Sequence, residues 1–256
     1  MSPLLKDILK LKGRGVISII GAGGKTSLMF RLARELAESD RSVLTTTTTK
    51  IFMPCPEQSP NTIIADSFYE LIETLRRELN RFNHLSAGSR QIPACGKLQG
   101  FEPGIINELW QAAFFDWIIV EADGAKRRSL KASDLHEPVV PGSTTHLVFV
   151  TGLDAIGKPL NDKYVYRAKI FSKNTDLPMG EPVDEQSVAI CTALEVKKAS
   201  ILLSSALKFV VLNKADTPDK LKSGRKIAAC LEKQNFYSGI VITSLTAMRP
   251  IWWLSE

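Results

Sequence analysis

Residues 15–30 read GVISIIGAGGKTSLMF, and this stretch decides the fold. Residues 16–20 form a short apolar run, rich in β-branched side chains and bounded by glycines, which predicts a buried strand. From about Lys25 to Glu38, leucines recur at every fourth position and predict a helix with one apolar face. The order of strand, glycine turn and helix predicts the first unit of an α/β protein.

The glycine turn predicts a phosphate-binding loop. A strand before it and a helix after it bring backbone N–H groups and the helix dipole to one point, where glycines allow close approach. In such a P-loop, Lys25 would reach the outer phosphates of a nucleotide and the Thr26 hydroxyl would bind Mg²⁺. The position six residues before Lys25 holds Ile19 instead of glycine, so the loop is a shortened variant; the alternative is a glycine turn that merely precedes a lysine. The predicted nucleotide-binding residues of this loop are Gly21, Ala22, Gly23, Gly24, Lys25, Thr26 and Ser27.

The rest of the chain continues to alternate strands and helices. Strands are predicted at 42–46, 62–65, 117–120, 146–150, 209–212 and 239–243, and helices at 68–79, at 105–114 and from Pro218 onward. This alternation predicts an α/β fold of the P-loop NTPase type, a mostly parallel sheet flanked by helices, in a single domain of residues 1–256. Residues 152–184 are rich in proline, glycine and charge and predict an irregular insertion or a small substrate-facing lobe.

Two carboxylates follow the apolar run 117–120. Glu121 and Asp123 stand two residues apart, on one face of the strand end, where they would face the phosphates. One would hold Mg²⁺ while the other orients the attacking water or substrate; the alternative is a polar strand exit. Thr47, within the threonine run 45–49, could also reach the metal, although threonine is simply a good strand former. The predicted catalytic residues are Lys25, Glu121 and Asp123, and the predicted metal ligands are Thr26, Thr47, Glu121 and Asp123.

The motif NKAD, residues 213–216, follows another apolar run and resembles the guanine-reading motif of GTPases. A carboxylate such as Asp216 can accept both N–H groups on the pairing edge of guanine, and adenine offers no matching pair. The stem of Lys214 can lie on the base. Asn213, Lys214 and Asp216 are therefore predicted nucleotide-binding residues, and GTP is favoured over ATP.

Composition narrows the function classes. The chain has 256 residues, a formal net charge of +6 and four cysteines. The absence of a CxxC pair indicates a reduced, cytoplasmic protein without structural zinc, and no apolar run is long enough to cross a bilayer. The positive charge suits a polyanionic ligand such as a nucleotide, whereas the aromatic interleaving of single-strand binders is missing, so no nucleic-acid partner is expected. The basic loop 126–131 could clamp an anionic substrate or could simply be solvated.

Seven motifs, in one order, resemble the YqeC family, whose members are accessory proteins linked to selenium-dependent molybdenum hydroxylases. The motifs are GAGGKTS, VLTTTTTKI, KLQGF, VEADGAKRRSLKA, HEPVVP, GLDAIGKPL and NKAD, from about Gly15 to Asp216. The resemblance implies a nucleotide-dependent role in making or inserting the selenium cofactor of such hydroxylases. With the motifs above, it favours an Mg²⁺-dependent NTP hydrolase. It also implies a selenium- or molybdenum-containing cofactor and a molybdenum hydroxylase as partners. The shortened loop and the threonine run are similar to Mur-type ligases, so the alternative is a ligase-like or kinase-like enzyme that uses ATP to activate a small acid.

Overall fold

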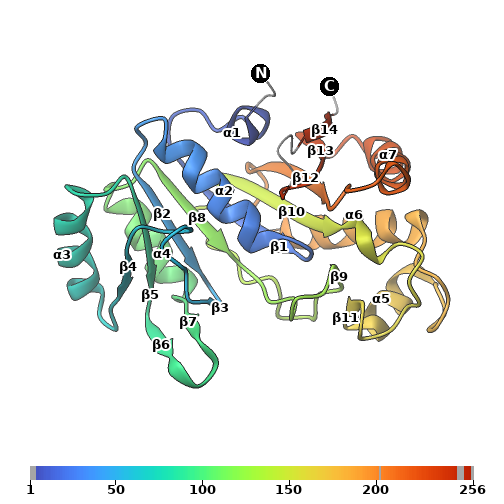
Figure 1. Cartoon of the computed structure of the whole chain (residues 1–256), viewed down its shortest axis with the longest axis horizontal. Coiled ribbons are helices and arrows are strands. Elements are labelled where there is room, and N and C mark those ends of the chain that lie inside the picture. The colour runs from blue at the N-terminus through green and yellow to red at the C-terminus, as the bar shows by residue number, and fades with distance from the viewer. Residues whose placement is uncertain (1–3, 202, 247–250, 255–256) are drawn as a thin grey trace.

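One nine-stranded sheet organises the computed structural model, which describes residues 4–201, 203–246 and 251–254 (Figure 1). Its strands follow the order β14-β13-β12-β10-β1-β8-β2-β5-β4, and neighbouring strands are parallel except for β13 and β14. The strands are β1 (Gly15–Gly21), β2 (Val43–Thr47), β4 (Thr62–Ile64), β5 (His84–Gly88), β8 (Trp117–Glu121), β10 (His146–Gly152), β12 (Leu207–Asn213), β13 (Gly239–Thr243) and β14 (Ile251–Leu254). The prediction of a mostly parallel sheet is confirmed.

Helices cover both faces of this sheet, because the central strands are apolar on both sides. All seven residues of β1 are buried: Val16 and Ile20 face one core, whereas Ile17 and Ile19 face the other. Each such side chain contributes about 1.5–3 kcal/mol of hydrophobic stabilisation. Figure 1 shows α2 crossing in front of the central strands, with α6 behind them. The helices are α1 (Leu5–Ile8), α2 (Lys25–Ala37), α3 (Phe68–Leu79), α4 (Pro103–Gln111), α5 (Ala168–Thr175), α6 (Glu185–Ala199) and α7 (Pro218–Glu232).

The helix starts follow the local sequence. Thr217 caps α7, its side chain accepting a hydrogen bond from the Lys220 N–H, and Pro218 occupies the first turn, as predicted. The Ser67 side chain accepts from the Glu70 N–H at the start of α3. Within the described residues, no helix combines the length and the apolar character that crossing a membrane requires.

Two small sheets lie beside the carboxyl ends of the large one. The first is antiparallel, in the order β3 (Lys50–Phe52), β7 (Lys97–Gln99) and β6 (Arg90–Ile92). It comes close to the end of β2, since a Cβ atom on Gly100 would lie 1.7 Å from the Thr47 carbonyl oxygen. The second pairs β9 (Leu130–Lys131) with β11 (Val165–Tyr166).

Residues 152–184 contain more regular structure than their composition predicts. The 3₁₀ helix η2 (Leu153–Ala155), the strand β11 and the helix α5 all lie in this segment. Another 3₁₀ helix, η1 (Pro93–Cys95), lies between β6 and β7. Phe171 of α5 is buried in the core shared with α6. This apolar anchor explains why the segment is ordered despite its many turn-forming residues.

Candidate functional site

The turn between β1 and α2 adopts a conformation that requires glycine. The φ angles of Gly21, Gly23 and Gly24 are 94°, 85° and 136°. A Cβ atom on Gly23 would lie 2.5 Å from the Gly152 nitrogen, and one on Gly24 would lie 2.2 Å from Nδ2 of Asn213. Helix α2 then begins at Lys25 without a side-chain cap. Because the first N–H groups of a helix have no intrahelical partner, they are available to an anion at this turn.

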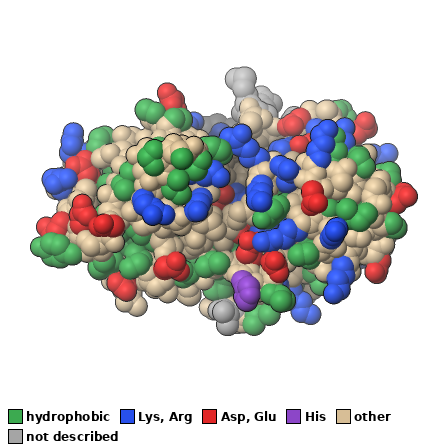
Figure 2. Space-filling model, turned by 90° about the horizontal axis from the view of Figure 1, so that it is seen from below, with side chains coloured by type: hydrophobic (Ala, Val, Ile, Leu, Met, Phe, Trp, Pro, Cys, Tyr) green, Lys and Arg blue, Asp and Glu red, His purple; other side chains and the backbone are tan. Residues whose placement is uncertain are grey.

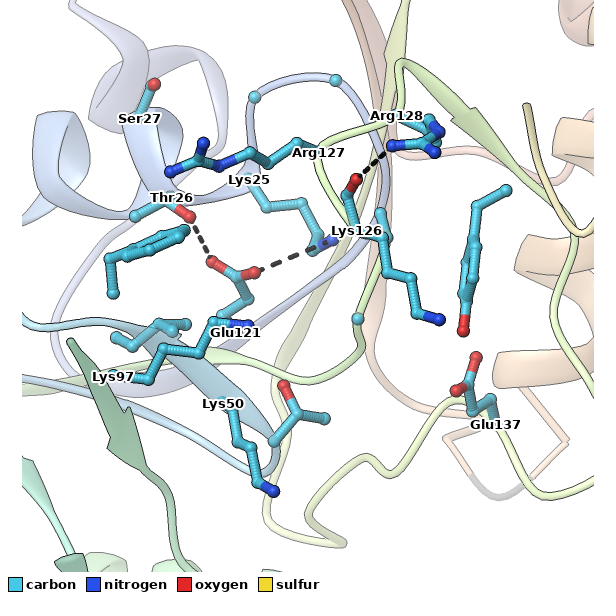
Figure 3. Close-up of a pocket in the computed structure, with 18 of the residues that line it drawn as sticks. Lys25, Thr26, Ser27, Lys50, Lys97, Glu121, Lys126, Arg127, Arg128 and Glu137 are labelled. Atoms are coloured by element: carbon cyan, nitrogen blue, oxygen red, sulfur yellow. Dashed lines mark hydrogen bonds and ion pairs between the residues drawn. The ribbon is translucent and has the colours of Figure 1, made fainter. Parts of the chain in front are cut away.

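Lys25 is buried at this turn and is neutralised by acids of the neighbouring strand. Its Nζ donates to the Gly21 carbonyl oxygen at 2.7 Å and lies 3.0 Å from Oδ1 of Asp123 and 3.7 Å from Oε1 of Glu121. Burial opposes the ammonium form, but attraction to Asp123 and Glu121 outweighs it and raises the pKa of Lys25. Lys25 is therefore charged, and its ammonium group lies beside the turn (Figure 3).

Asp123 joins Lys25 to a chain of alternating charges that starts in the interior and ends at the half-buried pair Glu137 and Arg167. Its Oδ2 accepts from the Gly21 N–H at 2.8 Å and from Nζ of Lys131 at 2.9 Å. Lys131 also donates to Glu137 at 2.8 Å, and Glu137 accepts from both terminal nitrogens of Arg167. Burial opposes ionisation of Glu137, yet its bonds to Arg167 and Lys131 lower the pKa of its carboxyl group. Asp123 thus serves two lysines and one backbone amide.

Thr26 and Glu121 bring a hydroxyl and a carboxylate oxygen together beside the turn. The Thr26 hydroxyl donates to Oε2 of Glu121 at 2.6 Å, and the Thr47 hydroxyl donates to the Glu121 carbonyl oxygen, also at 2.6 Å. Burial raises the pKa of Glu121, against the opposing effects of Lys25 and Thr26. Hydroxyl and carboxylate oxygens suit Mg²⁺, which usually takes few protein ligands and completes its shell with phosphates and water. In the described part of the chain, no group of three or more His, Cys, Asp and Glu side chains could hold a metal by itself.

The residues of NKAD lie on the other side of β1. Asn213 is buried; its Nδ2 donates to the Gly23 carbonyl oxygen at 2.8 Å, and its Oδ1 accepts from the Leu245 N–H at 3.1 Å. Lys214 donates to Ser129 at 2.7 Å and to Asp154 at 2.9 Å. Burial opposes ionisation of Asp154, but its bonds to Ser129 and Lys214 lower the pKa of that carboxyl group.

Asp216 is the exposed member of the motif. It accepts a hydrogen bond from the Ser244 hydroxyl, and its carboxylate lies 4.0 Å from Nζ of Lys220, one helical turn along the chain. The side chain is 46% exposed, so a ligand can reach its oxygens. Asn213 therefore holds the turn, whereas Asp216 faces outward beside it.

A cavity of about 520 Å³ opens above the turn and extends toward the small sheets. Figure 2 shows Lys and Arg side chains gathered around the middle of this face. The lining residues are Gly23, Gly24, Lys25, Thr26, Ser27, Thr49, Lys50, Ile51, Phe52, Lys97, Gln99, Glu121, Gly124, Ala125, Lys126, Arg127, Arg128, Glu137, Tyr166 and Lys214. A volume of this size accommodates a small molecule.

Comparison with protein-family models matches residues 17–169 to the family described as YqeC protein. The chain belongs to the YqeC family. It is 38% identical over 176 residues to the uncharacterized protein YqeC of Escherichia coli (strain K12), a match that covers 69% of this chain and 66% of that relative.

Solved structures match this YqeC family member only at low identity and low structural similarity. The cell division protein FtsY of Thermotoga maritima is 13% identical, with a TM-score of 0.43, over 96% of this chain and 71% of that one. The hydrogenase maturation factor HypB of Archaeoglobus fulgidus is 13% identical, with a TM-score of 0.43, over 94% and 86% of the two chains. Identities and scores this low do not assign a function.

Only some of the predicted site residues lie within the part of the chain that matches the YqeC family model. The turn and the acidic pair lie within residues 17–169, whereas NKAD lies beyond them. The structure brings Lys25, Thr26, Glu121 and Asp123 into direct contact and places Asn213 against the same turn.

Sequence reasoning missed several pocket residues of this YqeC chain. Phe52 and Tyr166 line the cavity, and Arg167 pairs with its lining residue Glu137, but all three come from segments without a recognisable pattern. Lys97 and Gln99 belong to the KLQGF stretch, whose glycine was the available signal, since Gly100 marks a close approach of two backbones.

Proposed function

We propose that this chain binds a nucleoside triphosphate with Mg²⁺, with the outer phosphates at the turn that opens α2. The observation that supports this most directly is the combination of an uncapped helix start, glycines at positive φ and the charged, buried Lys25. Backbone N–H groups, a helix dipole and an ammonium group then converge on one point, which is the chemistry that a polyphosphate requires.

Each side chain has a role that follows from its contacts. Lys25 would exchange Asp123 for the outer phosphates, and Thr26 with Glu121 would hold Mg²⁺ against them, with Thr47 behind Glu121. Mg²⁺ supplies charge neutralisation at the phosphates when it is bound. Glu121 lines the cavity and Asp123 does not, so Glu121 is the acid that we propose to hold the metal. Asp123 keeps Lys131 and the Gly21 amide in place.

We propose GTP as the preferred nucleotide. Asn213 binds the Gly23 carbonyl oxygen, so a base that follows phosphates at the turn would come to the exposed Asp216 carboxylate. That carboxylate can accept the paired N–H groups of guanine, whereas adenine offers no matching pair of donors.

Calorimetric titration with Mg·GTP, Mg·ATP and GTP in EDTA tests this proposal. We expect Mg·GTP to bind most tightly and Thr26→Val to remove the gain in affinity that Mg²⁺ gives. Thr48→Val is the matched control, because the Thr48 hydroxyl donates to the Val139 carbonyl oxygen and does not line the cavity. Absence of heat with both nucleotides for the folded wild-type chain would refute the proposal.

The resemblance to the YqeC family supports an accessory role in making or inserting the selenium cofactor of molybdenum hydroxylases. In that role, slow nucleotide hydrolysis should accelerate when a hydroxylase partner is added. A second candidate is a ligase-like or kinase-like enzyme that activates a small acid, and it is favoured by the basic wall of the cavity beside Lys25. In that case, turnover should depend on the acid and not on a protein partner.

A further inference from the structure

The cavity continues past the turn on the side opposite to NKAD. In the large sheet, β12 lies two strands from β1 on one side, and β8 and β2 lie on the other. The separate small sheet of β3, β7 and β6 approaches the end of β2, where Gly100 lies against Thr47. A nucleotide whose base points toward Asp216 would therefore leave the space around Phe52 and Lys97 empty. Phe52 and Lys97 line the same cavity as Lys25, Thr26 and Glu121.

Five basic side chains that line the cavity have no carboxylate partner among the residues that the structure describes: Lys50, Lys97, Lys126, Arg127 and Arg128. Backbone carbonyl oxygens hold the guanidinium of Arg128, which leaves the other four as the unpaired set. They differ from the other basic side chains of the site. Lys25, Lys131, Arg167 and Lys214 are all paired with acids at 3.0 Å or less. The charges of the paired cations are neutralised by acids, whereas the charges of the unpaired cations remain available in the cavity (Figure 3).

Phe52 presents an aromatic face to these charges. Its side chain is 46% exposed, the guanidinium carbon of Arg127 lies 4.2 Å from its ring centroid, and Nζ of Lys97 lies 5.4 Å from it. An exposed ring with two cations over it suits the stacking of a planar, electron-rich group.

The four unpaired cations and Phe52 form one wall of the cavity, and the backbone adopts an unusual conformation at two of these residues. Lys126 and Arg127 have φ angles of 44° and 62°, in the left-handed region that non-glycine residues rarely adopt. Arg128 secures the turn: its N–H donates to Ala125, and its guanidinium donates to the carbonyl oxygens of Lys126 and Asp162. Strain of this kind persists where the surrounding structure imposes it, and it clusters at ligand sites.

We propose that this wall binds a second, small-molecule ligand that carries both a planar unsaturated ring and a phosphate or carboxylate group. The ring of the ligand stacks on Phe52, where it either displaces the guanidinium of Arg127 or contacts it. Lys97 and Lys50 bind the anionic group. Its position next to the terminal phosphate of a nucleotide rests on the proposed function, whereas the binding of ring and anion does not. A small molecule fits better than a nucleic acid, because the wall lies within a cavity of about 520 Å³ instead of along a groove.

The test uses phenyl phosphate as the probe, with cyclohexyl phosphate and phenol as matched probes that lack the ring face or the charge. Ligand-observed NMR titrations are run on the whole chain, with and without a saturating, non-hydrolysable GTP analogue and Mg²⁺. We expect the wild-type chain to bind phenyl phosphate about 2–10-fold more tightly than cyclohexyl phosphate, the range that one aromatic contact supplies. Phenol should bind most weakly.

Two variants and one control locate the binding. Phe52→Leu should remove the preference for the aromatic phosphate, and Lys97→Gln should weaken both phosphates several-fold. Lys163→Gln is the control, because Lys163 also lies over an aromatic ring, that of Tyr164, but does not line the cavity. Equal affinity for the two phosphates, or binding unchanged in both variants, would overturn the proposal. Displacement of phenyl phosphate by a ten-nucleotide oligothymidine would assign the wall to nucleic acid and overturn it as well.

Titration of the same samples with Mg·GTP separates the two proposals. Binding of phenyl phosphate that depends on Phe52, in a chain that does not bind GTP, would support the second site and refute the nucleotide function. The reverse result would support the nucleotide function and refute the second site.

Discussion

Replacing Asp123 with asparagine should destabilise the fold severely, because this carboxylate neutralises two buried lysines. Asp123 is 1% exposed, lies 3.0 Å from Nζ of Lys25 and accepts from Nζ of Lys131 at 2.9 Å and from the Gly21 N–H at 2.8 Å. An asparagine amide cannot carry the negative charge, and its NH₂ group would face a donor. Removing one partner of a buried ion pair costs about 3–5 kcal/mol, and we expect Asp123→Asn to lose about 4 kcal/mol of unfolding free energy.

The matched control is Asp154→Asn, the same chemical change at a half-buried ion pair. Asp154 bonds Lys214 at 2.9 Å, but both side chains are about one third exposed, and pairs of this kind contribute up to about 1 kcal/mol. Urea unfolding at pH 7, followed by far-UV circular dichroism, measures both variants, and the m-value should stay unchanged.

A loss below about 1 kcal/mol for Asp123→Asn, or equal losses for the two variants, would refute the role of Asp123 as the buried counter-ion. Added Mg·GTP should stabilise Asp123→Asn more than it stabilises the wild-type chain, because its phosphates would give Lys25 a new partner.

The remaining predictions concern specificity, pH and nucleic acid. Asp216→Asn should weaken Mg·GTP at least several-fold more than Mg·ATP in calorimetry, whereas Asp219→Asn should not; equal losses would mean that Asp216 does not read the base. Burial lowers the pKa of His84 from 6.5 to about 4, so the unfolded state takes up the proton first and stability falls as pH drops through this window. Between pH 7 and 5 this loss is about 2 kcal/mol, and His84→Gln should remove it from the pH slope of urea unfolding while His136→Gln leaves the slope unchanged. Fluorescence anisotropy should detect no binding of labelled oligothymidine at physiological salt; tight, salt-sensitive binding would contradict the exclusion of nucleic acid.

Most strands of the large sheet were predictable because they are apolar runs, whereas β5, which reads HLSAG, and β14 were not predicted. The run 117–120 became β8, the run 146–150 became the core of β10, and glycine ended β1 where it was expected to. Helix α6 escaped prediction for a physical reason: its buried face includes Glu195, which accepts from the Ser133 N–H at 2.7 Å, so its apolar periodicity is broken. Strands of two or three residues, such as β9 and β3, are too short to produce a pattern.

Contacts within the site were predictable only where parallel strands fix them. Strand β8 lies next to β1, so Glu121 at the end of β8 and Asp123 just after it meet Lys25 across the strand ends. The pairing of Glu137 with Arg167 and the stacking of Arg127 on Phe52 join segments far apart in the chain. Such pairs depend on how loops fold back, which hydrophobic spacing does not encode.

Groups on or just after three other strands of the sheet hold the turn between β1 and α2 by hydrogen bonds that need no ligand. The Gly21 amide is held from β8, the Ala22 amide from β10 through Val150, and the Gly23 carbonyl oxygen from β12 through Asn213. Its shape is therefore inherited from the sheet and does not have to be created by the anion. A phosphate that binds at the turn, as we propose, would therefore lose little of its binding energy to ordering the backbone. A substitution that disturbs the end of any of these strands would weaken that binding by loosening the turn.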